Sequence, residues 1–291
     1  MKFNTKKIID KIISLIYCIF SFICICIFIQ IFIIASFNIP TNSMYPELIP
    51  GDNILVFKPF IGARIFNIYS TLEHKQVKIF RAPGIKKIKR NDILVFNNPY
   101  PNNWNKIEMH ILKYFIKRCI AIPKDTLYIQ NGVYRINHSN FSVRNIQSQK
   151  VISGLNKDSL SKEEYYSFPF DSIIRWNIKN FGPLYIPGKG DTVTLDRTNF
   201  QLYKKLIEWE QQGDLQYRDS TVYLNANPIK SYCFQNNYYF LAGDNVINSQ
   251  DSRYWGLLPE EYIVGKACII WKSFEPYTNK FRWERFFKVI H

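Results

Sequence analysis

The longest pattern in the chain is an apolar run near its start, from Ile12 to Phe37. No charged side chain occurs between Ile12 and Pro46. As an α-helix, residues 12–37 would be about 39 Å long, enough to cross a hydrocarbon core of about 30 Å with some tilt. The pattern therefore predicts a membrane-spanning helix over residues 12–37.

The basic residues that flank this run lie mostly on one side of it. The next basic residue after the run is Lys58, whereas four precede it: Lys2, Lys6, Lys7 and Lys11. This asymmetry predicts that residues 1–11 are cytoplasmic and that the body of the chain lies outside. A cleavable secretory signal is the alternative, but its apolar region is usually roughly 7–15 residues and ends in a small-x-small site. We favour a retained anchor, because this run is longer and lacks such a site.

Beyond Ser43 the pattern changes to short apolar runs separated by turns, which is typical of β-strands. Strands are predicted at residues 54–57, 92–96, 113–122 and 262–274. Asn131-Gly132 predicts a hairpin, because both central positions of such a turn need a positive φ. Residues 137–190 are polar and irregular, and residues 199–212 form an amphipathic helix pattern.

These elements predict a mainly β body of two sub-domains, carried by one N-terminal transmembrane helix. The expected division is residues 1–11, a cytoplasmic N-terminus; 12–37, the anchor; 38–136, the first part of the β core; 137–235, an inserted second sub-domain; and 236–291, the closing part of the core with a basic aromatic tail. Residues 281–290 interleave aromatic and basic side chains. The tail either packs on the body or lies at a bilayer interface, with its aromatic rings among the headgroups.

Composition limits the class of protein. Of 291 residues, 47% are apolar, which supports a substantial core, and the net charge of +15 suits an anionic membrane surface or a nucleic acid. No single block of basic residues dominates the chain. The six cysteines have no metal-ligand or disulfide spacing, and no nucleotide- or phosphate-binding motif occurs. We therefore expect no metal and no cofactor.

Ser43 lies between Pro40 and Pro46, a few residues beyond the predicted span. By itself this segment is more typical of a polar turn at the membrane exit than of a catalytic site. A nucleophilic serine would need a base within hydrogen-bond reach, most often a histidine. The four histidines lie outside any turn motif that would present them, which disfavours a Ser-His-Asp triad: His74, His110, His138 and His291.

A lysine is the alternative base, but its pKa of about 10.4 must fall by two to three units, at a cost of roughly 3–4 kcal/mol. Lys117 suits this role, since its neighbours on the same strand face would be Phe115 and Cys119 while Arg118 points to the other face. A lysine on an edge strand with its ammonium in water fits the same pattern.

Three segments together resemble the signature boxes of bacterial type I signal peptidases. Residues 40–46, Pro-Thr-Asn-Ser-Met-Tyr-Pro, resemble the serine box, and residues 114–118, Tyr-Phe-Ile-Lys-Arg, resemble the lysine box. Residues 243–256, which run from Gly-Asp-Asn to Trp-Gly, are similar to the third signature. Their order and rough spacing agree from Ile39 onward, behind an anchor whose N-terminus is inside.

The resemblance implies a Ser-Lys peptidase. Ser43 would attack the scissile carbonyl, and Lys117 would act as the general base. Thr41 would donate its hydroxyl to the oxyanion beside the Ser43 backbone N–H. Ser249 would hydrogen-bond and orient the Lys117 amine. Two further groups are implied: loop support from Asp244, Asp251 and Arg253, the last two as an ion pair, and an apolar substrate pocket lined by Ile39, Met44 and Ile116.

The resemblance also implies partners and a location. The substrates would be signal peptides of exported pre-proteins, in contact with membrane lipid and with the export machinery as a further candidate partner, and no nucleic acid is expected. The enzyme would be single-pass in the plasma (inner) membrane, with its catalytic body on the outer, periplasmic side. Val246-Ile247 departs from the family's usual Arg-Asp, and Ala121, Lys124 and Glu47 replace common residues.

Two other functions fit parts of the sequence. A self-cleaving Ser-Lys regulator is disfavoured by the predicted anchor and by the lack of an N-terminal helix-turn-helix pattern. An anchored basic binding protein with an inactive site, directed to anionic lipid or nucleic acid, is the non-enzymatic alternative. Replacement of Ser43 by alanine separates the enzyme from the binding protein.

Overall fold

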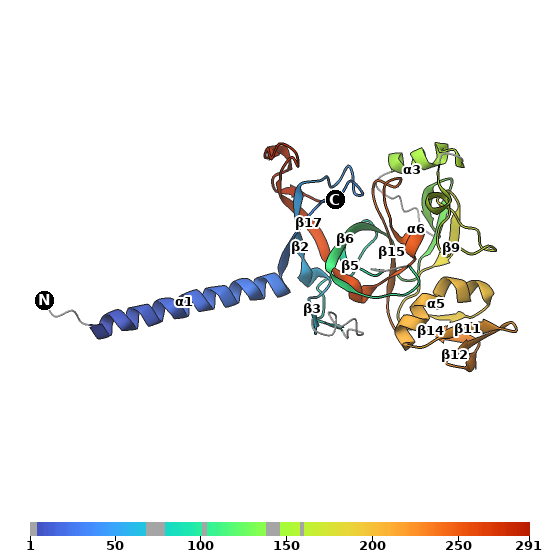
Figure 1. Cartoon of the computed structure of the whole chain (residues 1–291), viewed down its shortest axis with the longest axis horizontal. Helices are drawn as coiled ribbons and strands as arrows, with labels where there is room; N and C mark the ends of the chain where they lie inside the picture. The colour runs from blue at the N-terminus through green and yellow to red at the C-terminus, as the bar shows by residue number, and fades with distance from the viewer. Residues whose placement is uncertain (1–4, 68–78, 101–103, 138–145, 158–159) are drawn as a thin grey trace.

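The computed structural model describes residues 5–67, 79–100, 104–137, 146–157 and 160–291. A single long helix, α1 (Thr5–Phe32), extends away from a β-rich body that carries the C-terminus (Figure 1). The protein is mainly β, with one N-terminal apolar helix, as the sequence pattern predicts.

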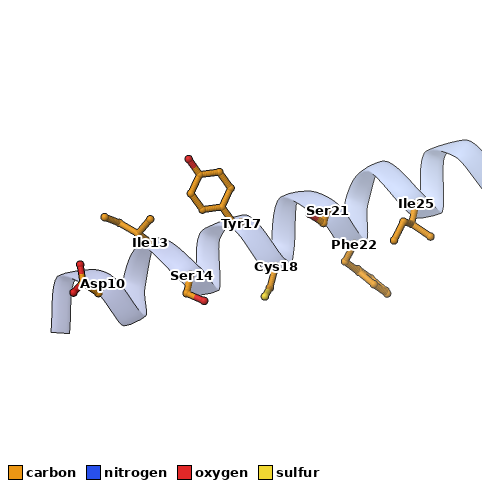
Figure 2. Close-up of a pocket in the computed structure, with 8 residues that line it drawn as sticks. All are labelled: Asp10, Ile13, Ser14, Tyr17, Cys18, Ser21, Phe22 and Ile25. Atoms are coloured by element: carbon orange, nitrogen blue, oxygen red, sulfur yellow. The ribbon is translucent and has the colours of Figure 1, made fainter. Parts of the chain in front are cut away.

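Within α1, Ile9–Phe32 is the one helix of the described chain that is long and apolar enough to cross a membrane. Its large apolar side chains are exposed, as expected for a surface that faces lipid. Figure 2 shows a shallow hollow along one side of this helix, which contains none of the predicted site residues. Its lining contains both polar and apolar side chains: Asp10, Ile13, Ser14, Tyr17, Cys18, Ser21, Phe22 and Ile25.

The predicted helix over residues 12–37 is wrong at its C-terminal end. The helix ends at Phe32, and β1 (Ile34–Asn38) pairs antiparallel with β2 (Asp52–Phe57). The apolar run alone cannot mark this boundary, because a short apolar stretch fits a buried strand as well as a helix. The partner strand decides it, since β2 supplies the backbone hydrogen bonds that residues 34–38 would otherwise make within a helix.

The largest sheet of the described chain has eight strands, and its strand pairs are antiparallel. Its order is β1-β2-β17-β5-β6-β15-β16, and β18 pairs with β17. The strands beyond β2 are β5 (Ile93–Asn98), β6 (His110–Ala121), β15 (Tyr238–Ala242), β16 (Leu258–Pro259), β17 (Ile263–Ser273) and β18 (Lys288–Val289). The predicted strands at 54–57, 92–96, 113–122 and 262–274 all fall in this sheet.

The strand β5 lies inside the body, and all six of its residues are buried. Alternate residues of a strand point to opposite faces. Leu94 and Phe96 join a large apolar cluster on one face, whereas Ile93 and Val95 join a smaller cluster on the other. The sheet therefore has a core on both sides, and its strands can hold side chains rigidly.

The region after β6 begins with the predicted hairpin, β7 (Thr126–Gln130) and β8 (Val133–Ile136). Asn131 and Gly132 have φ values of 49° and 76°, as this turn requires. The strand β9 (Phe181–Tyr185) completes a three-stranded sheet with them. The expectation that residues 137–190 lack regular structure is wrong, because this stretch contains β9 and two helices, α3 (Ile146–Gly154) and α4 (Lys162–Tyr165).

The predicted amphipathic helix over residues 199–212 is α5 (Arg197–Gln211). Asp196 caps it, since its side chain accepts a hydrogen bond from the Asn199 backbone N–H at 2.7 Å. The sequence pattern predicts an apolar side that also includes Trp209, and all its other members are buried: Phe200, Leu202, Tyr203, Leu206 and Ile207. Five short strands lie nearby along the chain: β10 (Thr192–Thr194), β11 (Leu215–Arg218), β12 (Thr221–Leu224), β13 (Asn227–Ile229) and β14 (Ser231–Cys233).

The remaining elements connect the main sheet or close it. They are η1 (Lys58–Phe60), β3 (Arg64–Phe66), β4 (Ile79–Arg81), α6 (Ser252–Trp255), η3 (Glu260–Tyr262) and η4 (Trp283–Arg285). The basic aromatic tail packs on the body: β18 joins the sheet, and buried Arg285 forms an ion pair with Asp52 at 2.6 Å. Trp283 and Phe287 keep 74% and 58% of their surface exposed, so a contact with the bilayer interface stays a prediction.

Candidate active site

Lys117 lies on β6, directly opposite Leu94 of β5. Only 5% of its surface is exposed. Its Nζ donates a hydrogen bond of 2.7 Å to Ser43 Oγ, across 74 residues of sequence. Burial lowers the pKa of Lys117 to about 8, while Asp251 raises it, Arg253 lowers it further and Asp244 raises it. The lysine can therefore lose its proton near neutral pH.

Ser43 is presented by a turn between β1 and β2. The turn is fixed from below by Met44 and Leu48, which are 1% and 0% exposed. The Leu48 backbone N–H donates to the Met44 carbonyl at 2.9 Å and closes the turn. The exposed Thr41 Oγ1 lies 3.4 Å from Ser43 Oγ, so both hydroxyls face the same space.

Gly243 allows the loop between β15 and α6 to approach Ser43. A Cβ at this position would lie 2.5 Å from the Ser43 carbonyl oxygen and 2.3 Å from Ser249 Oγ, which real Cβ atoms do not tolerate. The next residues hold the serine turn: the Asn245 backbone N–H donates to the Ser43 carbonyl at 3.1 Å. The glycine is therefore needed for close packing of two backbones around the serine.

Asp251 and Arg253 form the predicted ion pair beneath this loop. Arg253 Nε donates to Asp251 Oδ1 at 2.8 Å, and both side chains are essentially buried. Asp251 also accepts the Gly243 backbone N–H at 3.1 Å, and Arg253 Nη2 donates to the carbonyls of Val246 and Ser249. The pair thus fixes both ends of residues 243–251, and it lies close enough to influence the pKa of Lys117.

One predicted contact is not formed in this structure. Ser249 was expected to hydrogen-bond the Lys117 amine, but its Oγ is buried and has no hydrogen-bond partner among the described residues. Lys117 Nζ instead donates to Ser43 Oγ. A lysine ammonium has three N–H donors, so the bond to Ser43 leaves donors that a shift of the Ser249 hydroxyl could reach.

Two contacts of the site were missed by the sequence analysis. Arg118 is 1% exposed, and its Nε and Nη2 donate to the two carboxylate oxygens of Asp244, each at 2.7 Å. The signal was present, because a cation on the inner face of a strand requires a buried partner. The second contact carried no sequence signal: Ser148 Oγ, on α3, accepts the Val246 backbone N–H at 3.0 Å.

The predicted pocket residues come together in the smaller apolar cluster beside the serine turn. Ile39 and Met44 are buried there, and Ile116 is partly buried against them. Phe37 of β1, which the sequence analysis did not single out, packs on the same cluster. The buried apolar side chains of this cluster lie beside the serine turn, and Ile116 and Phe37 keep part of their surface exposed.

The described residues contain no group of three or more His, Cys, Asp or Glu side chains that could hold a metal ion. Two of the histidines, His110 and His291, have exposed side chains, whereas His74 and His138 lie outside the described residues. The geometry thus joins one serine to one buried lysine, an arrangement that can support base-assisted nucleophilic attack.

Comparison with known proteins gives a consistent family. The model of the family "Signal peptidase, peptidase S26" matches residues 12–272. A signal peptidase I of Buchnera aphidicola from Acyrthosiphon pisum is 32% identical over 87% of this chain and 74% of its own. One from Aquifex aeolicus is 28% identical over 85% and 79%. A crystal structure of a signal peptidase I from Enterococcus faecalis covers 63% of this chain and 98% of its own, with 20% identity and a TM-score of 0.30. The family assignment rests on the sequence matches.

Proposed function

This chain belongs to the peptidase S26 family of signal peptidases, and we propose that it is a membrane-anchored serine endopeptidase that removes N-terminal signal peptides from exported pre-proteins. In this proposal Ser43 is the nucleophile and Lys117 the general base. The observation that carries it is the 2.7 Å contact between Ser43 Oγ and a lysine that is 5% exposed.

The first half of the reaction is acylation. Neutral Lys117 accepts the Ser43 proton while Oγ bonds to the scissile carbonyl carbon. The Thr41 hydroxyl and the Ser43 backbone N–H stabilise the negative oxygen of the tetrahedral intermediate. When the C–N bond breaks, Lys117 returns the proton to the leaving amine, which is the new N-terminus of the mature protein.

The second half is deacylation by water. Lys117, again neutral, takes a proton from the attacking water and passes it to Ser43 Oγ as the ester bond breaks. The signal peptide leaves with a free carboxylate, and the enzyme is restored. Ser249 keeps a role as a positioning residue here, because its buried hydroxyl lies beside Gly243 and has unused hydrogen-bonding capacity.

The surrounding groups hold this geometry. Asp251 and Arg253 brace the loop that packs against the Ser43 carbonyl, and Asp244 fixes β6 through Arg118. Partly exposed Ile116 offers an apolar contact for small side chains near the cleaved bond, and buried Ile39 and Met44 complete the apolar wall behind it.

The anchor places the enzyme where its substrates are. With α1 in the plasma membrane and the basic N-terminus inside, Ser43 works on the outer side, close to the lipid. A signal peptide still embedded in the bilayer is then presented at high local concentration, as for two linked modules. Membrane lipid and the export machinery are the partners that this location implies.

The direct test is cleavage of an exported precursor by the detergent-solubilised protein, with the cut located by mass spectrometry. Ser43→Ala should abolish cleavage, whereas Ser231→Ala, an exposed serine on β14, should not. Full cleavage by Ser43→Ala would exclude Ser43 as the nucleophile. A wild-type protein that binds precursors or anionic lipid without cutting would support the alternative, an anchored basic binding protein with an inactive site.

A further inference from the structure

The junction between α1 and the β body is a single residue long. The helix ends at Phe32 and β1 begins at Ile34, so only Ile33 lies between them. The Ile33 backbone N–H continues the helix by donating to the Ile29 carbonyl at 2.8 Å. The Ile33 carbonyl, by contrast, bonds to the β body, because it accepts a hydrogen bond from the Lys58 backbone N–H at 2.9 Å. No flexible linker separates the anchor from the sheet.

The Lys58 side chain closes the same junction from the other direction. Its Nζ donates to the carbonyls of Gln30 and Ile31, at 2.7 and 2.9 Å. The last carbonyls of a helix have no partners within the helix, and a cation there also complements the helix dipole. Lys58 follows β2 directly, at the start of η1, so this contact ties the end of the helix to the interior of the main sheet.

The strand β1 then connects this junction rigidly to the serine turn. Its five residues are paired with β2 from Ile34 to Asn38. The strand also contacts β17 through a side chain, because Ser36 Oγ accepts a hydrogen bond from Trp271 Nε1 at 2.9 Å. Beyond the strand, the Ile39 N–H donates to the Asp52 carbonyl at 2.8 Å. At about 3.3 Å per residue, β1 carries the chain at most about 17 Å from the helix end.

We infer that Lys58 and the one-residue junction act as a ruler, which holds Ser43 at a fixed height above the end of the membrane-spanning helix. The inference rests on the proposed function. A substrate whose apolar segment ends at the same depth can reach Ser43 only if the stretch between that segment and the cleaved bond is long enough to span this fixed height. Lys58 is thus a positioning residue that selects substrates by the distance between their apolar segment and their cleavage site.

The test uses the full-length protein in lipid vesicles and a set of precursors that differ only in this distance, from roughly three to nine residues. The wild type should have a sharp optimum, because a tether that cannot span the two sites gives almost no effective concentration. Lys58→Met removes the two side-chain hydrogen bonds and should flatten the profile, so that disfavoured lengths fall less than about 3-fold below the optimum instead of about 10-fold or more.

Three controls separate a ruler from a general defect. Lys58→Arg can still donate to the helix carbonyls and should restore the sharp optimum. Lys189→Met removes an exposed lysine from the loop between β9 and β10, and should behave as the wild type. A short peptide without an apolar segment should be cut equally by all variants, since the Ser43–Lys117 pair is unchanged.

An insertion provides a second route to the same answer if Lys58→Met fails to fold. A Gly-Ser pair placed after Ile33 leaves Lys58 intact but makes the junction flexible, and it should also broaden the profile. A flat profile for the wild type, or an equally sharp one for both altered proteins, would overturn the ruler while leaving the peptidase intact. If the wild type cut no precursor and no peptide, the proposed function itself would fail.

Discussion

Two lysines in this protein have a similarly lowered pKa but contact different groups. Burial lowers the pKa of Lys117 on β6 to about 8, and burial also lowers the pKa of Lys205 on α5 to about 8. Lys117 Nζ contacts a serine hydroxyl at 2.7 Å. Lys205 Nζ instead lies over two aromatic rings, 5.4 Å from the centroids of Tyr100 and Phe168.

The difference shows that a lowered pKa is not enough to make a lysine a catalytic base. The neutral amine also needs a hydroxyl group nearby from which it can accept a proton. Desolvation disfavours the ammonium form wherever a lysine is buried. Aromatic faces attract the charged form but offer no proton that a base could remove. Only Lys117 has a nucleophile within reach, together with Thr41 beside it and a braced loop behind it. Position, rather than ionisation alone, distinguishes the two lysines.

Substitutions of the two lysines should have the largest difference in effect on cleavage. Lys117→Arg should reduce cleavage at least about 10³-fold, because a guanidinium stays protonated and cannot accept the serine proton. Lys205→Arg keeps the contact with the rings, and Lys205→Met removes it; both should cleave within about 2-fold of the wild type. The measurement is kcat/KM on a precursor with a defined cleavage site.

Activity of Lys117→Arg above about 10% of the wild type would remove Lys117 from the role of base. Equal losses of kcat/KM in the Lys117 and Lys205 variants would mean that either buried lysine is needed for folding. The comparison would then say nothing about which lysine acts as the base. Circular dichroism of each variant checks that the fold is retained.

The oxyanion contact is expected to be the next largest effect. Thr41→Val keeps the shape of the side chain and loses its hydroxyl, so cleavage should slow by about 10²–10³-fold, mainly through kcat. Thr41→Ser retains the donor and should be mild. A Thr41→Val protein as fast as the wild type would show that this hydroxyl points elsewhere during the reaction.

Stability should change in the opposite direction to activity. Lowering the pKa of Lys117 from 10.5 to about 8 costs the folded state about 3 kcal/mol while the lysine is protonated. Lys117→Met should therefore raise the free energy of unfolding at pH 7 by up to about 3 kcal/mol. Lys205→Met should gain less, because it also loses two cation–π contacts of about 0.5–1 kcal/mol each.

The pH dependence of this gain has a definite sign. The folded pKa lies below the unfolded value, so the cost is fully present below pH 8 and disappears as the pH rises toward 10.5. The advantage of Lys117→Met in thermal unfolding of the solubilised protein should shrink over that range. A gain that does not change with pH would attribute the stabilisation to packing instead.

Local pattern predicted much of the fold. The hairpin at Asn131-Gly132, the buried side of α5 and the strands of the main sheet follow from period and turn chemistry, which are properties of neighbouring residues. The end of α1 did not follow, because residues 34–38 become a strand only through pairing with β2. A partner outside the local window decided that boundary.

The site divides in the same way. Residue types and their order identified Ser43 and Lys117, and the Asp251–Arg253 pair, two residues apart, was also predicted. Contacts that depend on the distant path of the chain were missed, such as Ser148 with Val246. The expected bond from Ser249 to the amine is not formed in this structure, where the buried Ser249 hydroxyl has no hydrogen-bond partner among the described residues.

The pH–rate profile of the wild-type enzyme tests the central claim most directly, because it measures the ionisation of the group that acts as the base. If Lys117 is that base, kcat/KM should rise toward alkaline pH with an apparent pKa near 8, and Lys205→Met should leave this profile unchanged. A rise controlled by a pKa near the free histidine value of about 6.5 would contradict the account and assign the base to a histidine.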